Sequence, residues 1–232
     1  MFDKRIQELK RFYLLLEDLG ERLGGARTLN RCTKHIGWPE RGVYFFFEEG
    51  ERRVHTGTGL RVVRVGTHAL KSGSRASLWT RLSQHRGSSA GGGGNHRGSI
   101  FRLLIGTALI NREGYVCPTW GEGNTPSSEI RRGEVILERA VSAAIGAMSF
   151  SWIPVLDDPG PSSHRGFIER NAIALLSNYG REPAVDPLSL TWLGLRCNRE
   201  RVRMSGLWNS NHVDEKPDPG FLDILEKLVR EV

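Results

Sequence analysis

Arg81 and His85 are the residues whose types and spacing point most directly to chemistry. They are four positions apart in a segment predicted to be helical, so their side chains lie on one helical face. A guanidinium can hold a phosphate with two donors and stabilise added negative charge. A histidine can accept a proton from a nucleophile, or hydrogen-bond a phosphate or Tyr44. The pair therefore predicts phosphate chemistry, and an exposed basic helix face is the alternative.

Tyr44 lies in the apolar run Val43–Phe47, whose composition predicts a buried strand. A free tyrosine has a pKa of about 10, so it would act as a base only beside cations or a metal. A core tyrosine among phenylalanines is the alternative, because aromatic runs mostly mark core strands. Phosphodiester hydrolysis needs an oriented water, a route for its proton and cations that stabilise the transition state. Tyr44, Arg81 and His85 could together meet these needs.

Glu169 is the preferred candidate for a metal ligand. A hard carboxylate suits Mg²⁺ (or Mn²⁺), an ion that keeps several waters and uses few protein ligands. The alternative is a surface glutamate paired with Arg165, four residues earlier. Glu134 and Glu138 are competing carboxylates, and we interpret them as the solvated face of the preceding helix.

In this order, the segments resemble the motifs of the GIY-YIG nucleases. Gly42-Val43-Tyr44 matches the first motif, and Arg64-Val65-Gly66 stands where the family has its second. The resemblance covers roughly residues 42–180, with an insertion at about 87–127. It implies that Tyr44 points into the active cleft and helps activate or position the water. It also implies that Arg81 is the catalytic arginine and that Glu169 binds the metal.

The second motif departs from the family pattern, because Arg64 replaces a tyrosine. Arg64 could contact a phosphate or be solvated on the strand. Gly66 is expected to let the chain turn sharply after that strand. The family also holds the phosphate region with an asparagine after the glutamate helix, for which Asn178 and Asn209 are the candidates. A buried structural asparagine is the alternative for each.

The charge of the chain suits a polyanion. It has 33 Lys plus Arg against 26 Asp plus Glu, a net charge of +7, which favours binding through phosphate neutralisation. A solvated basic surface is the alternative. Side chains that could bind backbone phosphates are Arg64, His68, Lys71, Arg75, Arg86 and Arg97. The glycine run 91–94 is expected to be mobile and is not a P-loop, because no Gly-Lys-Ser/Thr follows it.

Periodicity and capping residues predict one α/β (α+β) domain. A mostly antiparallel three-stranded sheet is flanked by helices, with N- and C-terminal elaborations. Expected helices are 3–23, from Ser74 or Ser77 to about 86, 99–110 with Ser99 as its cap, 128–145, from Ser162 or Ser163 to about 177, and 220–230. Expected strands are 43–47, 61–65 and about 148–153, with a turn at 48–51, an irregular excursion at 111–127, and short strands or loops around Trp192 and Trp208. The parts would be an N-terminal helix at 1–24, the nuclease-like domain at 42–180, and an extension at 181–232 packed on it.

These observations predict a metal-dependent DNA endonuclease, in the restriction branch of the family. Repair, mobile-element and RNA nucleases stay open, as does a catalytically inactive nucleic-acid-binding module, which the Arg64 departure supports. A palindromic site would favour a homodimer. Three scattered cysteines indicate reduced thiols in a cytoplasmic protein, neither a disulfide framework nor a zinc site. The charged start is unlike a signal peptide, and no apolar run approaches the ~20 residues of a membrane span, so no membrane partner is expected.

Overall fold

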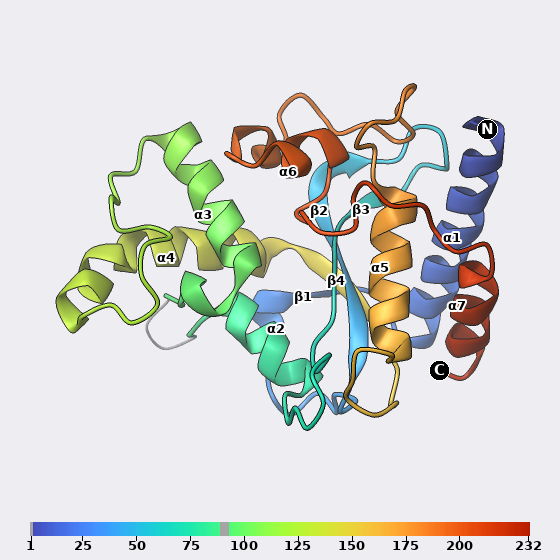
Figure 1. The fold of residues 1–232 in the computed structure, drawn as a ribbon, viewed down its shortest axis with the longest axis horizontal. Coiled ribbons are helices and arrows are strands. Elements are labelled where there is room, and N and C mark those ends of the chain that lie inside the picture. The colour runs from blue at the N-terminus through green and yellow to red at the C-terminus, as the bar shows by residue number, and fades with distance from the viewer. Residues whose placement is uncertain (1, 89–92) are drawn as a thin grey trace.

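An antiparallel sheet at the centre of the molecule contains the aromatic run (Figure 1). The structure is a computed structural model that describes residues 2–88 and 93–232. Within these residues the sheet has four strands in the order β1-β4-β2-β3. The strands are β1 (Arg27–Thr28), β2 (Gly42–Arg52), β3 (Leu60–Gly66) and β4 (Ser149–Pro154). The predicted antiparallel sheet is confirmed, and the two-residue β1, too short to show periodicity, adds a fourth strand.

The predicted turn at 48–51 is wrong, because β2 continues to Arg52. Its pairing with β3 shifts register after Phe46 and again after Phe47. The polar continuation is stable because its carboxylates find partners from other segments. Glu48 accepts hydrogen bonds from the indoles of Trp192 and Trp208 at 3.0 and 3.1 Å, and buried Glu51 forms an ion pair with Arg61. These partners are distant in sequence, so the Glu-Glu-Gly-Glu segment by itself indicates a turn.

Alternation along β2 divides the core into two clusters. Val43 and Phe45 face one side, and Tyr44 and Phe46 face the other. Helices α1 (Phe2–Arg22), α5 (His164–Leu176) and α7 (Phe221–Arg230) cover the Val43 side. Helices α2 (Leu78–Arg86), α3 (Ile100–Glu113) and α4 (Ser128–Ala147) cover the Tyr44 side. Figure 1 shows the two groups of helices on opposite sides of the sheet.

Serine side chains start four of these helices, and three of the caps were expected from the sequence, the exception being Ser127. Ser77, Ser99, Ser127 and Ser163 each accept a backbone hydrogen bond from three residues further on. Helix α3 extends to Glu113, where Gly114 ends it with φ 75°, so the irregular excursion begins later than predicted. Gly91 and Gly92 of the predicted mobile loop lie outside the described residues.

The C-terminal region wraps the open edge of β3. After η3 (Leu193–Arg196) and α6 (Glu200–Ser205), the Trp208 amide donates to Val63 O at 2.7 Å. Short 3-10 segments also occur at η1 (Leu29–Arg31) and η2 (His96–Gly98). The three cysteines are free thiols. A search of the described residues found no helix with the length and apolarity to cross a membrane.

Candidate active site

Tyr44 of strand β2 contacts His85 of helix α2 in the core of the protein. The Tyr44 hydroxyl lies 2.7 Å from His85 Nε2, and both side chains are 0% exposed. Strand alternation turns Tyr44 towards α2, and the Ser77 cap starts that helix two turns before His85. Burial, then Arg81, Arg64 and Arg102, hold the pKa of His85 well below its usual value. His85 is therefore neutral at physiological pH, with a ring nitrogen able to accept a proton.

Gly66 makes room for the Tyr44 ring. The two residues are cross-strand partners, and a Cβ at position 66 would lie 2.3 Å from the Tyr44 hydroxyl and 2.4 Å from Cζ. Gly66 is not among the glycines with positive φ. The close approach of the ring therefore explains this glycine, and the sharp turn that the sequence suggested does not.

Arg64 is buried beside this pair, so the solvated alternative is wrong. Its side chain donates to Trp208 O, and its guanidinium carbon lies 5.2 Å from the centre of the Phe101 ring. Burial lowers the pKa of Arg64, and Tyr44 and Glu169 oppose that shift. The Nε atom is buried and has no hydrogen-bond partner among the described residues. Arg64 is thus a desolvated cation with an unused donor.

A cavity of about 310 Å³ opens next to Arg64 and Glu169. Burial raises the pKa of Glu169, and electrostatic interactions with Arg64 and then His212 oppose that effect. The proposed pair between Glu169 and Arg165 is wrong, because buried Arg165 forms its ion pair with Asp157. The remaining wall of the cavity is formed by Ile100, Ile173, Arg199, Asn209, Ser210, Asn211 and His212.

The two candidate asparagines occupy different places. Asn209 lies on the cavity wall, where its amide bonds Val65 N at 3.1 Å and Val65 O at 2.9 Å. Asn178 lies among other partners: its Oδ1 accepts from Arg5 and from Val185 N, both at 3.0 Å, and it is not part of that wall. Of the two, only Asn209 is close to the predicted site.

The predicted phosphate-binding cations separate into exposed and internally bonded ones. Lys71 and Arg75 are exposed. Arg81 is half-buried and donates to Gly98 O at 3.2 Å. Arg86 donates to Cys32 O and lies 5.0 Å from the Trp79 ring centre. His68 is buried, with Nε2 3.3 Å from Glu40 O.

The interpretation of Glu134 and Glu138 as a solvated face is wrong. They are 2% and 4% exposed, because the inserted segment folds back over α4 and covers them with cations. Arg97 forms two hydrogen bonds with Glu134 at 2.7 and 2.8 Å, which gives this arginine a structural partner in place of DNA phosphate. Glu138 pairs with Arg102 and accepts from His96 Nδ1 at 2.9 Å.

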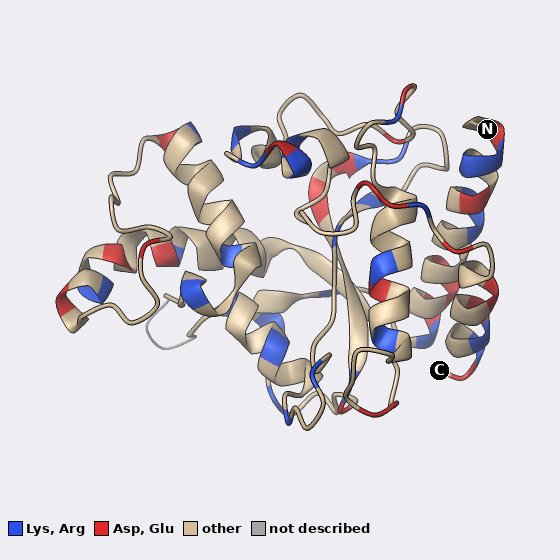
Figure 2. Ribbon diagram, in the orientation of Figure 1, with Lys and Arg blue, Asp and Glu red and all other residues tan. Residues whose placement is uncertain are grey.

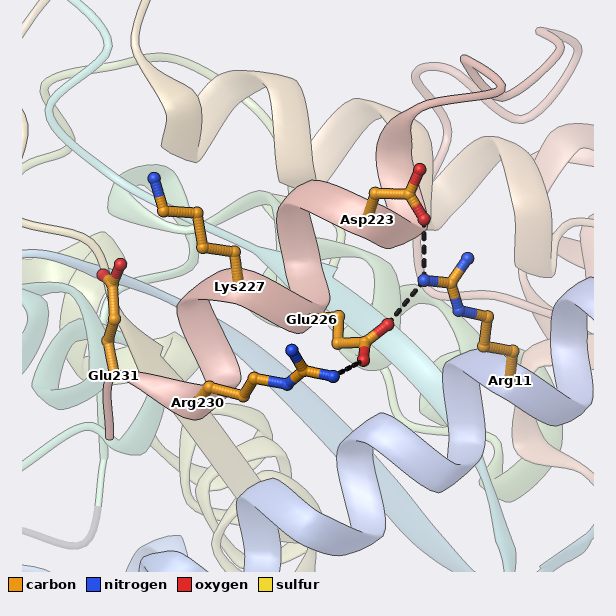
Figure 3. Close-up of a pocket in the computed structure, with 6 residues that line it drawn as sticks. All are labelled: Arg11, Asp223, Glu226, Lys227, Arg230 and Glu231. Carbon is orange, nitrogen blue, oxygen red and sulfur yellow. Dashed lines mark hydrogen bonds and ion pairs between the residues drawn. The ribbon is translucent and has the colours of Figure 1, made fainter.

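A second pocket, of about 430 Å³, lies between α1 and α7 (Figure 3). Arg11 there contacts Asp223 at 2.7 Å and Glu226 at 2.5 Å, and Arg230 also pairs with Glu226. Its charges largely neutralise each other, so this pocket resembles a surface ion-pair network more than a site for an anionic substrate.

Three residues belong to the site although the sequence did not single them out for it: Ser99, Arg199 and His212. Ser99 Oγ lies 2.7 Å from His85 Nδ1, whereas the sequence indicated only its capping role. Arg199 and His212 lie on the cavity wall with Glu169. The polar run 209–212 could have indicated this wall from the sequence, but the family pattern singled out only Asn209 within it.

The donors present suit an ion with few protein ligands. The described residues contain no group of three or more His, Cys, Asp or Glu side chains placed to hold a metal. Glu169 offers one carboxylate on the wall of a cavity with room for several waters. Mg²⁺ binds in this way through one or two carboxylates and retained water. The residues therefore fit a hydrated divalent cation.

Comparison with known proteins identifies a family for the chain. Neither the curated proteins nor the solved structures include a match to the chain. The family model described as GIY-YIG domain matches residues 3–232, so the match includes the inserted segment and both terminal regions. The resemblance seen in the motifs is thereby confirmed, and the chain belongs to the GIY-YIG domain family.

Proposed function

We propose that the protein is a metal-dependent endonuclease that hydrolyses phosphodiester bonds in DNA. A GIY-YIG domain indicates a nuclease, and the net charge of +7 suits a polyanionic substrate. The observation that carries the proposal is the 2.7 Å contact between Tyr44 and neutral His85, with Arg64, Arg81 and Glu169 nearby. These groups supply a proton acceptor and positive charge at one place.

Arg64 is proposed to receive the scissile phosphate. It interacts electrostatically with both Tyr44 and Glu169, and it lines the cavity, whereas Tyr44 is fully covered. A phosphate that engages the unused Nε donor would draw the guanidinium towards the cavity and uncover the Tyr44 oxygen. An arginine thus replaces the second-motif tyrosine with a group that can bind the substrate directly.

The proposed proton route runs through the contact between Tyr44 and His85. A water attacks phosphorus and passes its proton to the Tyr44 oxygen, while Tyr44 passes its own proton to His85 Nε2. A new phosphorus–oxygen bond forms, the bond to the leaving oxygen breaks, and that oxygen takes a proton from solvent. Arg64 and Arg81 stabilise the added negative charge. When bound at Glu169, a divalent cation such as Mg²⁺ or Mn²⁺ supplies Lewis-acid stabilisation of the phosphoryl oxygens.

We further propose that the enzyme cuts at defined sequences, as a restriction endonuclease does. Reading bases requires side chains that reach the grooves. The described part of the inserted segment and the polar Arg199–His212 wall are the proposed reading surfaces, because Ile100 of the insertion and Arg199 and His212 all line the cavity. Exposed Lys71 and Arg75 are proposed to contact the DNA backbone. A palindromic target would favour two copies of the chain that pair stably or transiently.

The test is cleavage of supercoiled plasmid and phage DNA with Mg²⁺, Mn²⁺ or EDTA. Tyr44→Phe, Arg81→Ala and Glu169→Gln are compared with Arg11→Ala, a variant outside the site. Metal-dependent cleavage that the first three variants lose and Arg11→Ala keeps would support the nuclease, and discrete fragments would support defined recognition. Intact DNA with salt-sensitive binding would overturn the proposal in favour of an inactive binding module, and stronger cleavage of competing RNA would reassign the substrate.

A further inference from the structure

Ser99 completes a buried chain of three side chains. The Tyr44 hydroxyl lies 2.7 Å from His85 Nε2, and Ser99 Oγ lies 2.7 Å from His85 Nδ1, on the opposite side of the ring. Tyr44 and His85 are 0% exposed and Ser99 is 1% exposed. The inserted segment between α2 and α4 supplies this third group, although the first two lie in the motifs shared with the family.

Hydrogen-bond geometry shows what Ser99 can do for His85. Neutral histidine has one donor and one acceptor nitrogen, so Nε2 can take the Tyr44 proton only if Nδ1 carries the hydrogen. That Nδ1–H then donates to Ser99 Oγ, which also accepts the Arg102 amide at 3.3 Å as the cap of α3. A hydroxyl oxygen has two acceptor lone pairs, enough for both donors.

The position of Ser99 is fixed by an ion pair behind it. Arg102, 0% exposed, donates to His85 O at 2.8 Å, to Glu138 Oε2 at 3.0 Å and to Glu138 O at 2.8 Å. The same helix end therefore holds the backbone of His85 through Arg102 and its ring through Ser99. Charged or titratable groups near His85 are Tyr44 of β2, Arg64 of β3, Arg81 of α2 and Arg102 of α3, with Glu138 of α4 beyond Arg102.

We propose that Ser99 is a positioning residue for the hydrolysis reaction. It holds His85 with Nε2 free to accept the Tyr44 proton, and it accepts a hydrogen bond from Nδ1–H when the ring becomes an imidazolium. Three cations influence His85, and among the described residues the Ser99 oxygen is the side-chain partner of Nδ1. Loss of that acceptor would disfavour the protonated ring and allow the other tautomer. This inference rests on the proposed nuclease function.

The first measurement is the tautomer of His85 in the wild-type protein, read from ¹⁵N chemical shifts of labelled histidine. We expect Nδ1 to be protonated and Nε2 to be unprotonated at pH 7.5. A His85 whose Nε2 carries the hydrogen would overturn the proposal. This readout needs neither a variant nor cleavage, so it is separate from the test of nuclease function itself.

The second measurement compares Ser99→Ala with Ser99→Thr and Ser127→Ala in steady-state cleavage of DNA. Ser127 caps α4 by accepting the Ile130 amide at 3.2 Å, so its alanine variant loses a helix cap without touching His85. We expect Ser99→Ala to lower kcat about 10- to 100-fold with little change in KM. Its ¹⁵N spectrum should show both His85 tautomers, and Ser99→Thr should recover most of the rate. Equal effects of Ser99→Ala and Ser127→Ala on kcat would reduce Ser99 to a helix cap and contradict the proposal.

Discussion

The two faces of the central sheet use the same strand in different ways. On the Val43 and Phe45 side, α1, α5 and α7 pack mainly through hydrocarbon. Charged residues are frequent along α1 and α7 (Figure 2), where Arg11 pairs with Asp223 and Glu226 (Figure 3). On the Tyr44 and Phe46 side, the core encloses His85, Arg102 and Glu138. A buried charge is tolerated only when it is paired and hydrogen-bonded. The first face therefore acts mainly as a scaffold, although its helix α5 also carries Glu169 to the cavity, whereas the other face holds a polar network whose members depend on each other.

The largest loss of stability is expected when Glu138 is removed from the polar network on the Tyr44 side of the sheet. Glu138→Ala would leave Arg102 buried without its carboxylate, which costs about 3–5 kcal/mol in the free energy of unfolding. Urea unfolding followed by circular dichroism would measure it. Glu129→Ala, at an exposed position in the same helix, is the control. Equal losses in the two variants would show that the buried network contributes little to stability.

A second effect on stability depends on pH and comes from His68, in the loop after β3. Burial, then Arg165, Arg81 and Arg41, lowers its pKa to about 4 in the folded protein. Between the unfolded pKa of about 6.5 and that value, the unfolded chain binds a proton that the folded chain does not. This group therefore removes stability as pH falls from about 6.5 to 4, by up to roughly 3 kcal/mol.

The check is urea unfolding at pH 7, 6, 5 and 4. His68→Gln should lose less stability on acidification than the wild type, whereas exposed His35→Gln should follow the wild type. Parallel pH curves for wild type and His68→Gln would contradict a buried neutral histidine at this position.

Phe12 offers a way to weaken the scaffold face alone. Its ring is 0% exposed and lies 5.9 Å from Phe45 and 6.2 Å from Phe221. Phe12→Leu should cost about 1–2 kcal/mol through lost contact area. Cleavage by the folded fraction should be unchanged, as measured well below the melting temperature. A fall in kcat without further unfolding would show that the two faces are coupled.

The smallest effect is expected in the surface network between α1 and α7. Arg11 is 42% exposed and contacts Asp223 and Glu226. Exposed ion pairs contribute little, so Arg11→Ala should shift Tm by less than about 3 °C. Differential scanning calorimetry at low and high salt would measure it. A larger shift, persisting at high salt, would place this network in the same class as the buried one.

Local sequence patterns predicted the elements that bear the motifs, for physical reasons that are themselves local. Strand alternation placed Tyr44, and the Ser77 cap with helical spacing placed His85, so this pair was foreseeable. The partners of Glu134 and Glu138 lie in the inserted segment, and nothing in local periodicity indicates that it folds back over α4. The spacing from the motif likewise could not show whether Asn178 or Asn209 lies at the site. The path of the C-terminal region along β3 determines this, because it brings Asn209 next to Val65.

The close approach of Gly66 to Tyr44 means that the residue types at these two positions, one in each motif, constrain each other. Any side chain at position 66 would overlap the phenol, with 2.3 Å from its Cβ to the hydroxyl. A side chain at position 66 would fit only after Tyr44 had been replaced by a smaller residue. Once Tyr44 has been replaced in that way, position 66 no longer needs to be glycine. Among descendants of this chain, the tyrosine and the glycine should therefore be kept together or lost together.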